Sequence, residues 1–450
     1  MRIETEEALP VDRGHWPTRD SMPGDPTKSG FVYRGIVWWG GLLVRTYHRV
    51  EIVGEAIPES TPVLLVQNHS NGLCDAHILM CTTQRPLRIL VKYKLITAPL
   101  IGWMLRQMEA VPVYRQKDGV DTRKNAKSFE AIDESLRSGS VVALFPEGES
   151  LNAIGIRALR SGVARMAASA ELSSEDGIGL QVVPVGVTYE DRDRMRGLAS
   201  AVVGPPIDVA PILAEYGNKP SRAVTQAILA SVTEGMRELI LDTDSQEKHD
   251  TAVALERLLP QSTGEDSAPI GIRRKRALTA LEGDVSRSSS AKEQAIRDLG
   301  GRFAAARLTG DEVLGSAPST GATYGPLVVW LPVLLFCLPF WTPIALFAMF
   351  ISRFPKTPDK VATLRVLFGY LGLVLMIPTV AIVGALVGGW IGACVGLAMY
   401  WLAAQVFVTA FDEWLNTRRK AARRALDKSP EELEALRVSL RSIREAYAAK

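Results

Sequence analysis

The sequence predicts an α/β domain with a mixed sheet flanked by helices, an N-terminal interfacial helix and a C-terminal all-α membrane region. Two patterns support this fold class. From residue 51 to about residue 215, short apolar runs alternate with helical stretches, which is typical of α/β folds. Residues 366–411 contain no Asp, Glu, Lys, Arg or His, and a soluble core rarely contains such a run.

The N-terminal segment divides at about residue 28. Residues 1–28 are polar and rich in proline, so we expect a flexible tail. Residues 29–50 mix apolar side chains with Trp, Tyr and Arg, and these aromatic residues favour the boundary between membrane and water. We therefore expect residues 29–50 to form a helix that lies in the membrane interface, with an ordinary core helix as the alternative.

Residues 51–215 form the predicted α/β domain. The apolar runs that are candidate strands lie at residues 61–67, 87–93, 109–115, 140–146, 180–189 and 200–204. Helix-prone stretches, such as residues 122–138 and 158–170, lie between them. This alternation predicts a sheet with helices packed against it.

Two charged regions flank the apolar C-terminal third. Residues 216–325 are charged, helix-prone and interrupted by Ser-rich and Gly-rich stretches, so we expect a helical connector, to which we assign no chemistry. Residues 412–450 are basic and amphipathic. A basic helix directly after a membrane segment is expected to lie on the cytoplasmic side, facing lipid headgroups.

The membrane region itself spans residues 326–411. Residues 366–388 and 389–411 are each about as long as the ~20 residues that cross a bilayer, and predict two transmembrane helices joined at Gly388-Gly389. Residues 326–350 contain three prolines, which interrupt the helix ladder and favour a broken hairpin over a single crossing. The hairpin also places every basic segment on one side, as the positive-inside tendency requires.

Composition limits the class of protein. At 450 residues the chain is long enough for two or three domains, and its net charge of +3 gives no case for nucleic-acid binding. The four cysteines form no disulfide framework and suit a reducing cytoplasm. The acidic N-terminus lacks an apolar segment, so we expect no secretory signal peptide.

His69 is the first candidate catalytic residue. It follows an apolar strand and precedes the turn sequence Ser70-Asn71-Gly72. An imidazole steered by Asp75 would be a competent general base for a hydroxyl. However, Asp75 follows His69 by six positions, which on a regular helix is a rotation of about 240°, so a turn must bring the pair together. The alternative is a turn histidine, with Asp75 capping the next helix.

Charged and glycine residues follow other candidate strands. Glu147 and Gly148, in "FPEGES", place a carboxylate and a close backbone approach at a strand exit. Arg115 ends "VPVYR", where a guanidinium could hold a phosphate, and Lys92 in "LVKYK" offers another cation. For each residue, a solvated surface charge or an ordinary turn is the alternative.

Several enzyme classes are disfavoured by missing patterns. The sequence contains no Gly-x-Ser-x-Gly elbow, no Walker phosphate loop and no dinucleotide fingerprint. With five histidines and no Cys/His pairs at ligand spacing, it also gives no reason to expect a structural zinc site.

The ordered blocks "NHSNGLCD", "LVKYKLITAPLIGW", "VPVYR", "FPEGES", "LRSGVARMA" and "VVPVGVTYE" together resemble the glycerol-phosphate and lysophosphatidate acyltransferase family over about residues 30–210. The resemblance implies an acyltransferase-type sheet. It also implies that His69 deprotonates the acceptor hydroxyl and that Asp75 orients His69. By the same resemblance, substrate is bound by Lys92, Arg115, Glu147, Gly148 and, on the acyl-chain side, Pro184.

The sequence departs from the commonest family pattern in two places. Five residues separate His69 and Asp75 where four are usual, which resembles the branch that includes fungal glycerol-3-phosphate and dihydroxyacetone-phosphate acyltransferases. The usual "FPEGTRS" is "FPEGESLNAIGIR" here, so the arginine after the glycine is lost. Arg157 or Arg160 is expected to replace its charge.

The resemblance implies a membrane-bound enzyme that transfers a fatty acyl group from an acyl thioester, on coenzyme A or acyl carrier protein, to glycerol 3-phosphate. The alternatives are a lysophosphatidate or other lysophospholipid acceptor, and a catalytically degenerate membrane scaffold. We expect no metal and no other cofactor. The expected partners are the bilayer, the donor and the acceptor, with the catalytic domain on the cytoplasmic face.

Overall fold

The computed structural model describes residues 26–150, 154–260, 268–283, 290–315, 325–351, 353 and 359–447. The predicted tail at residues 1–28 lies almost entirely outside these ranges. The chain divides into two compact units. The first ends at Asp242 and also includes Pro269–Ile272, and the second contains the other residues after Thr243.

Within the described residues, the first unit contains one sheet of eight strands. The strands are β1 (His48–Gly54), β2 (Val63–Gln67), β3 (Leu87–Lys92), β4 (Val111–Val113), β5 (Val141–Leu144), β6 (Gln181–Tyr189), β7 (Gly197–Val203) and β8 (Ile207–Asp208). Their order is β1-β7-β6-β2-β5-β3-β4, with β8 also paired to β6. Only the pairs β6–β7 and β6–β8 are antiparallel, so the predicted mixed sheet is confirmed.

β2 lies at the centre of the sheet, between β6 and β5, and runs parallel to both. All five of its residues are buried, as expected for a strand covered by helices on both faces. The register pairs Val66 with both Leu144 and Pro184. The carboxyl ends of β2 and β5 therefore open at the same edge, where α/β folds place their sites.

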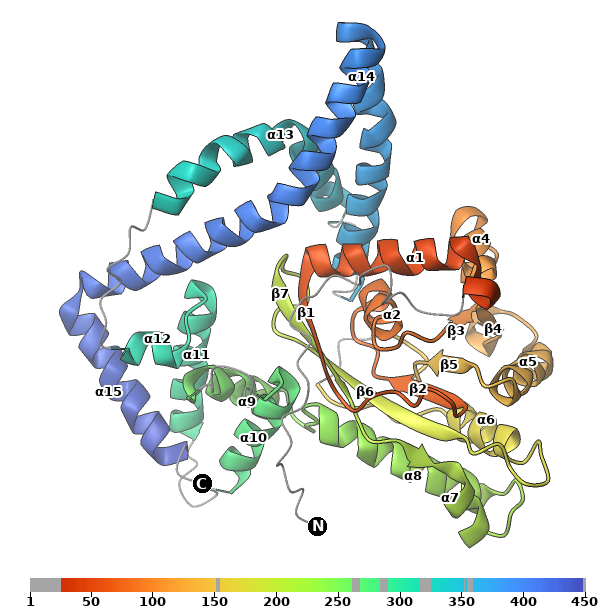
Figure 1. Ribbon diagram of the computed structural model, residues 1–450. Helices are drawn as coiled ribbons and strands as arrows, with labels where there is room; N and C mark the ends of the chain where they lie inside the picture. The colour runs from red at the N-terminus through yellow and green to blue at the C-terminus, as the bar shows by residue number, and fades with distance from the viewer. Residues whose placement is uncertain are drawn as a thin grey trace. The chain divides into compact units, whose positions relative to one another are not determined.

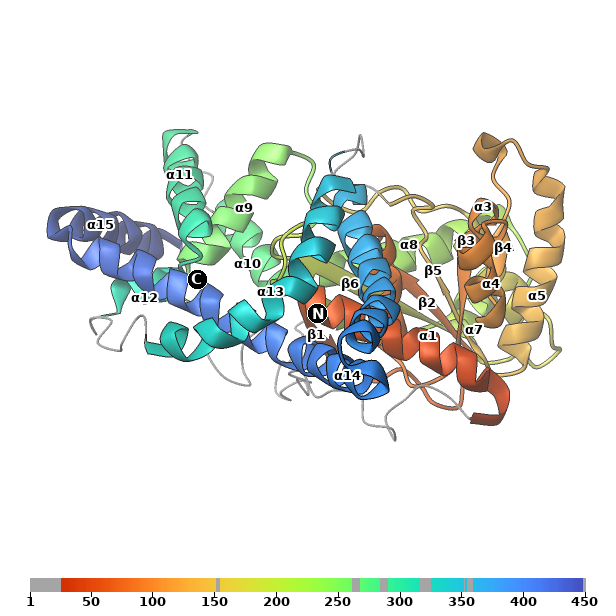
Figure 2. The same cartoon turned by 90° about the horizontal axis from the view of Figure 1, so that it is seen from above.

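Helices cover both faces of this sheet (Figure 1). They are α1 (Pro26–Tyr47), α2 (Gly72–Met80), α3 (Tyr93–Ile96), α4 (Pro99–Gln107), α5 (Asn125–Arg137), α6 (Gly162–Glu171), α7 (Val209–Glu215) and α8 (Arg222–Leu239). In Figure 1, α1 and α2 lie above the sheet and α6, α7 and α8 lie below it. α5 packs against the edge strand β4 (Figure 2).

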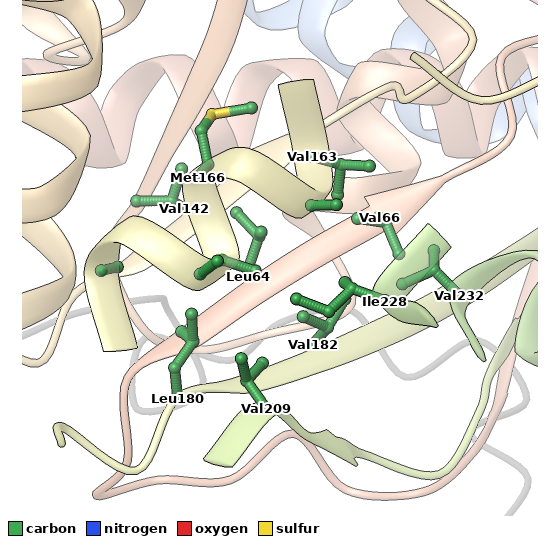
Figure 3. Close-up of a cluster of buried hydrophobic side chains, with 14 of the residues drawn as sticks. Leu64, Val66, Val142, Val163, Met166, Leu180, Val182, Val209, Ile228 and Val232 are labelled. Carbon is green, nitrogen blue, oxygen red and sulfur yellow. The ribbon is translucent and has the colours of Figure 1, made fainter. Parts of the chain in front are cut away.

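The main apolar core lies between the sheet and the lower helices (Figure 3). Leu64 and Val66 of β2 point into it, as do Ile228 and Val232 of α8, all without measurable exposure. Each such side chain stabilises the fold by about 1.5–3 kcal/mol relative to exposure in water. α8 belongs to this unit because its buried residues recur every four positions, from Val224 to Met236, and form one apolar stripe. The predicted connector at 216–325 thus begins with a helix of the α/β core.

The N-terminal boundary also differs from the sequence prediction. α1 ends at Tyr47 and β1 begins at His48, so the final residues of the predicted helix 29–50 are a strand. β1 pairs in parallel with β7 along its whole length. Its buried positions include His48, Val50 and Val53, a pattern that is easily read as the end of an apolar helix.

The second unit is helical in its described residues. It contains α9 (Gln246–Leu258), most of α10 (Ile270–Glu282), α11 (Ser290–Ala306), α12 (Gly310–Leu314), α13 (Gly325–Ile351), α14 (Asp359–Asp427) and α15 (Pro430–Tyr447). α15 buries Leu433, Leu436 and Leu440 in an apolar cluster, and it packs against α9 and α12. These leucines recur at helical spacing and form one apolar face. This face, in the tail that the sequence predicts to face lipid headgroups, therefore packs against protein.

α13 is one helix, where the sequence predicts a broken hairpin. Pro332, Pro339 and Pro343 all lie inside it. Steps of seven and four residues bring these prolines to about the same side of the helix, so the missing hydrogen bonds and steric clashes all act on one side. The helix accordingly bends rather than ends (Figure 1).

α14 reverses direction at Gly388 and Gly389, where the sequence predicts a turn. Gly389 has φ 63°, a conformation that favours glycine. The two arms then run side by side (Figure 1), and a Cβ placed on Gly384 would lie 2.3 Å from the carbonyl oxygen of Gly392. By length and composition α14 is the one described helix that could cross a membrane. That its arms do so stays a prediction.

Candidate active site

His69 and Asp75 meet at the exit of β2. His69 Nδ1 lies 3.0 Å from Asp75 Oδ2. The loop between them makes this possible, since His69 precedes α2 and Asp75 lies in the first turn of that helix. The backbone N–H groups of Ser70 and Asn71 donate to the same carboxylate oxygen at 2.7 and 2.6 Å. The six-position spacing is thus accommodated by a loop that wraps around the carboxylate.

This contact fixes the chemistry of the His69 ring. A carboxylate only accepts hydrogen bonds, so Nδ1 carries a proton in the bonded pair and Nε2 is left with its lone pair. The ring stacks on Phe145 with 3.9 Å between centroids and 15° between planes. The His69 side chain is 13% exposed whereas the Asp75 side chain is fully buried. The arrangement suits an oriented general base that a substrate can reach.

Asn68 anchors the loop to the neighbouring strand. Its side-chain amide donates to Val187 O at 2.9 Å, and its side-chain oxygen accepts from Val187 N at 2.7 Å. On the other side, Gly72 N donates to Ser150 Oγ at 2.9 Å and Arg192 Nη1 donates to Ser70 O at 3.0 Å. Contacts from three segments therefore hold the loop that carries His69.

Glu147 lies beside this pair in the turn after β5. It is buried, and that burial, together with the charge of Asp75, raises its pKa to about 7, against smaller opposing effects of the His69 backbone and Arg157. Gly148 has φ 74°, and its carbonyl oxygen accepts from Arg115 Nη1 at 3.1 Å. The turn therefore joins a carboxyl that titrates near neutral pH to a guanidinium.

The predicted cationic residues take up different positions. Arg115 also donates to Asp118 Oδ2 at 2.7 Å, so part of its charge is already paired. Arg160 packs against Gly148, with side-chain atoms 3.6 Å from where a Cβ would be. Arg157 is exposed and near enough to Glu147 to favour its ionised form. Lys92 ends β3 and precedes α3.

Pro184 lies apart from the His69 loop. It is buried in the middle of β6, paired with Val66, and its ring faces Gly204 and Gly235 at about 3 Å from their would-be Cβ positions. The structure therefore joins the segments that carry six of the predicted site residues through direct contacts, and it places Pro184 apart from them, beside α8. The six residues are His69, Asp75, Glu147, Gly148, Arg115 and Arg160. Among the described residues, no group of His, Cys, Asp and Glu is arranged to hold a metal ion.

Four side chains of the site were not singled out from the sequence. Phe145, Asn68 and Ser150 each lie within two positions of a predicted site residue, so their proximity was a usable signal. Tyr189 was different: its hydroxyl donates to Asp75 Oδ1 at 2.6 Å across 114 positions of sequence. Nothing in the local pattern at the end of β6 indicates that contact.

Residues 49–188 match the Acyltransferase family model. A chloroplastic 1-acyl-sn-glycerol-3-phosphate acyltransferase of Arabidopsis thaliana is 26% identical over 163 residues, which are 36% of this chain and 42% of that protein. The Glycerol-3-phosphate O-acyltransferase 2 of Saccharomyces cerevisiae is 26% identical over 132 residues, 29% of this chain and 17% of its own length. The chain therefore spans less than half of each of these relatives.

A solved structure, the 1-acyl-sn-glycerophosphate acyltransferase PlsC from Thermotoga maritima, aligns over 45% of this chain and 79% of its own, with 16% identity and a TM-score of 0.34. His69, Asp75, Arg115, Glu147 and Pro184 all lie in the segment that matches the family model. Residues 49–188 are therefore similar to the Acyltransferase family, and the relatives that share this similarity include 1-acyl-sn-glycerol-3-phosphate and fungal glycerol-3-phosphate acyltransferases.

Proposed function

We propose that this protein is a membrane-bound O-acyltransferase that moves a fatty acyl group from an acyl thioester to the hydroxyl of glycerol 3-phosphate. The supporting observation is the His69–Asp75 contact inside the segment that matches the family model. A scaffold that had lost activity would have no need for a buried carboxylate aimed at a partly exposed imidazole. The pair therefore favours the enzyme over the degenerate scaffold.

The geometry suggests how the reaction runs. His69 Nε2 takes the proton of the acceptor hydroxyl as its oxygen attacks the thioester carbonyl carbon. The tetrahedral intermediate then collapses, the C–S bond breaks, and the leaving thiolate takes the proton back from the imidazolium. Asp75 stabilises the positive ring between these steps. The donor's thioester supplies the activation.

The cations near Gly148 are proposed to hold the acceptor phosphate. Arg115 and Arg160 both contact Gly148, from different segments. A guanidinium binds phosphate oxygens in a planar fork, and two of them compensate most of a phosphate's charge. Lys92 and Arg157 would add positive charge around this position, and Glu147 would accept from an acceptor hydroxyl. A lysophosphatidate has the same phosphate, so this acceptor remains the alternative, favoured by the similarity to the Arabidopsis enzyme.

A groove beside Pro184 is a candidate place for the acyl chain. It has a volume of about 830 Å³ and includes Leu159, Ile207, Leu229 and Gly235 in its lining. Gly235 packs against Pro184, the residue that the family resemblance associates with the acyl chain. Burying each methylene of a chain in such a groove is favourable by about 0.8 kcal/mol.

Membrane attachment is proposed to involve the first unit as well as α14. Phe31 and Trp39 of α1 and Trp103 of α4 are exposed large apolar side chains, whereas Tyr33 and Val44 of α1 are buried against the domain. Trp residues favour the membrane interface. We propose that this face lies on the cytoplasmic surface of the bilayer, from which a lipid substrate could enter.

The decisive experiment is an acyl-transfer assay on the purified full chain. Labelled acyl-coenzyme A and acyl carrier protein are each offered with glycerol 3-phosphate or lysophosphatidate, and products are identified by mass. We expect product with glycerol 3-phosphate, and a loss of roughly 100-fold or more in His69→Ala, because the general base is removed. The control is His249→Ala, a histidine of α9 in the second unit.

Each other outcome has a definite meaning. Product formed only from lysophosphatidate would select the alternative acceptor. Unchanged transfer in His69→Ala would reject the mechanism, and no transfer by the wild-type protein with any pair would favour the scaffold.

A further inference from the structure

We propose that Tyr189 is a positioning residue for the catalytic pair: its hydroxyl holds the Asp75 carboxylate in the orientation that presents Oδ2 to His69. The inference rests on the proposed function in one respect, namely that His69 is the general base. It concerns a residue for which neither the sequence pattern nor the family resemblance gives a role.

The two oxygens of Asp75 have different partners. Oδ2 accepts from His69 Nδ1, Ser70 N and Asn71 N. Oδ1 accepts from Tyr189 Oη, at 2.6 Å. Asp75 has no exposed surface, so water cannot substitute for a lost donor. Without the tyrosine hydroxyl, a buried carboxylate oxygen would lack this donor, and rotation of the carboxylate would be the available relief.

The protonation state of Tyr189 suits a donor. Burial, and after it the charge of Asp75, raises the pKa of Tyr189 well above its ordinary value of 10.0. The hydroxyl therefore keeps its proton at any pH at which the enzyme would work. Because an ionised carboxylate cannot donate, the direction of the hydrogen bond is fixed.

The backbone places Tyr189 accurately. Asn68, the residue before His69, bonds both the N–H and the carbonyl of Val187, which locks the end of β6 to the end of β2. Side chains two positions apart on a strand point to the same face, so Tyr189 follows the register that Val187 sets. The Tyr189 ring also packs against the buried ring of His48, at 5.1 Å between centroids. The hydroxyl is thus fixed from two sides.

A purely structural role for Tyr189 is the competing explanation, since buried tyrosines commonly hydrogen-bond to a carboxylate. The two explanations differ in what the hydroxyl does to His69. Without the hydroxyl, the carboxylate can turn Oδ2 away from His69 Nδ1, which weakens the contact that favours the protonated imidazole. The ring should therefore lose its proton at lower pH in Tyr189→Phe, whereas loss of packing alone has no such directional effect.

Other charged and titratable groups also act on these residues. They are Cys74 and Glu147 near Asp75, His48 behind Tyr189, and the guanidinium groups of Arg157, Arg192 and Arg196. Tyr189→Phe changes none of these groups and keeps the ring that packs on His48. A shift in the pH dependence of His69 can therefore be assigned to the hydroxyl.

The experiment compares Tyr189→Phe with Tyr47→Phe in the full chain. Tyr47 is the matched control because its hydroxyl donates to Asp193 O at 2.7 Å, in the loop after β6, without contacting Asp75. The first readout needs no turnover: the rate at which diethyl pyrocarbonate modifies His69 is followed against pH by mass spectrometry. We expect the midpoint of this curve to move to lower pH by ~0.5 unit in Tyr189→Phe and to stay unchanged in Tyr47→Phe.

The second readout is kinetic, with a substrate pair that the wild-type protein uses. We expect kcat to fall ~10-fold in Tyr189→Phe while KM changes less than ~2-fold, because orientation of the base matters in the transition state. In an Asp75→Asn background, Tyr189→Phe should lower kcat little further, because the hydroxyl acts through Asp75.

The outcomes separate this proposal from the proposed function. A midpoint that stays at the wild-type pH overturns the role of Tyr189, even if kcat falls. Equal losses of kcat from Tyr189→Phe with and without Asp75→Asn also overturn it. If the wild-type protein transfers no acyl group but the midpoint shifts as expected, the proposed function fails while the coupling of Tyr189 to His69 stands. Melting curves check that each variant is folded.

Discussion

At the residue scale, the Asp75 carboxylate accepts hydrogen bonds both from a side chain and from the backbone of the preceding loop. Its carboxylate orients His69 and also satisfies the backbone N–H groups of Ser70 and Asn71. These amides precede the first turn of α2, where the helix dipole favours a negative charge. The extra residue between His69 and Asp75 is thus absorbed into a loop whose backbone donates hydrogen bonds to the Asp75 carboxylate.

Glu147 gives a prediction for stability against pH. Its pKa is raised from an ordinary 4.5 to about 7, so the folded state binds more protons than the unfolded state between these values. Folding stability should therefore fall as pH rises through this window, by roughly 3 kcal/mol at most. In Glu147→Gln this contribution disappears. Chemical unfolding of both proteins at pH 5 and pH 8 measures the difference.

The expected result is a loss of stability between pH 5 and pH 8 that is larger in the wild-type protein than in Glu147→Gln. Exposed acids contribute to both curves equally and cancel in the comparison. Parallel curves for the two proteins would contradict the burial of an ionisable carboxyl at this turn.

The sequence indicates part of this site and not the rest, for a physical reason. His69, Glu147 and Arg115 closely follow strand ends, and Asp75 lies in the first turn of α2. Such places are visible as breaks in an apolar pattern. Tyr189 ends an apolar strand that is buried along most of its length, as core packing alone would explain. Its hydrogen bond to Asp75 depends on the order β6-β2 in the sheet, which local patterns do not contain.

At the element scale, what local patterns do and do not contain explains why the bounds of β1 and the shape of α13 differ from the sequence prediction. The strands within 61–204 were predicted within a few residues because most of them are bounded by turn residues. Between α1 and β1 no turn residue intervenes, so hydrophobicity continues from Tyr47 to His48 and hides the boundary. In α13 the prolines do interrupt the hydrogen bonds of the helix, as expected. Because they lie on about the same side of the helix, they bend it and do not end it.

The exposed face of α4 gives a prediction about the membrane. Trp103 is 46% exposed, and we expect a spin label at Trp103→Cys to be more accessible to oxygen than to a water-soluble nickel complex in liposomes. The matched control is Tyr216→Cys, which follows α7 and is 41% exposed. That site should show the reverse preference. Equal behaviour at the two sites would argue against membrane contact through α4.

The close approach of the two arms of α14 gives a prediction about packing. Gly384→Val would force a side chain onto the carbonyl oxygen of Gly392, so the arms must separate. We expect a loss of about 1–3 kcal/mol, seen as a lower melting temperature in detergent. Gly369→Val is the control, because nothing lies within 4 Å of a Cβ at that position. If both variants melt alike, the arms do not pack at Gly384.

At the scale of the whole molecule, the charge distribution predicts one topology. Basic residues follow the apolar part of α14, with Arg418, Arg419 and Lys420 in succession. If α13 lies on the membrane without crossing it and α14 crosses twice, the α/β domain and this basic segment share the cytoplasmic side.

Cysteine labelling in sealed vesicles checks that topology. Single cysteines at Lys219, in the first unit, and at Lys420 are introduced after the four native cysteines are replaced by serine. An impermeant maleimide should label both positions from the same side. Labelling from opposite sides would mean that α13 crosses the membrane once.

One further consequence follows from the direct junction of α1 and β1. A helix held by a bilayer that continues into a strand without a spacer acts as a rigid lever, because no free residue can absorb a rotation. The first residue of that strand, His48, packs on Tyr189, whose hydroxyl bonds Asp75. If α1 lies in the membrane interface as proposed, changes in lateral pressure or bilayer thickness that tilt α1 would reach the His69 imidazole mechanically. The proposed acyl transfer would then depend on the physical state of the bilayer.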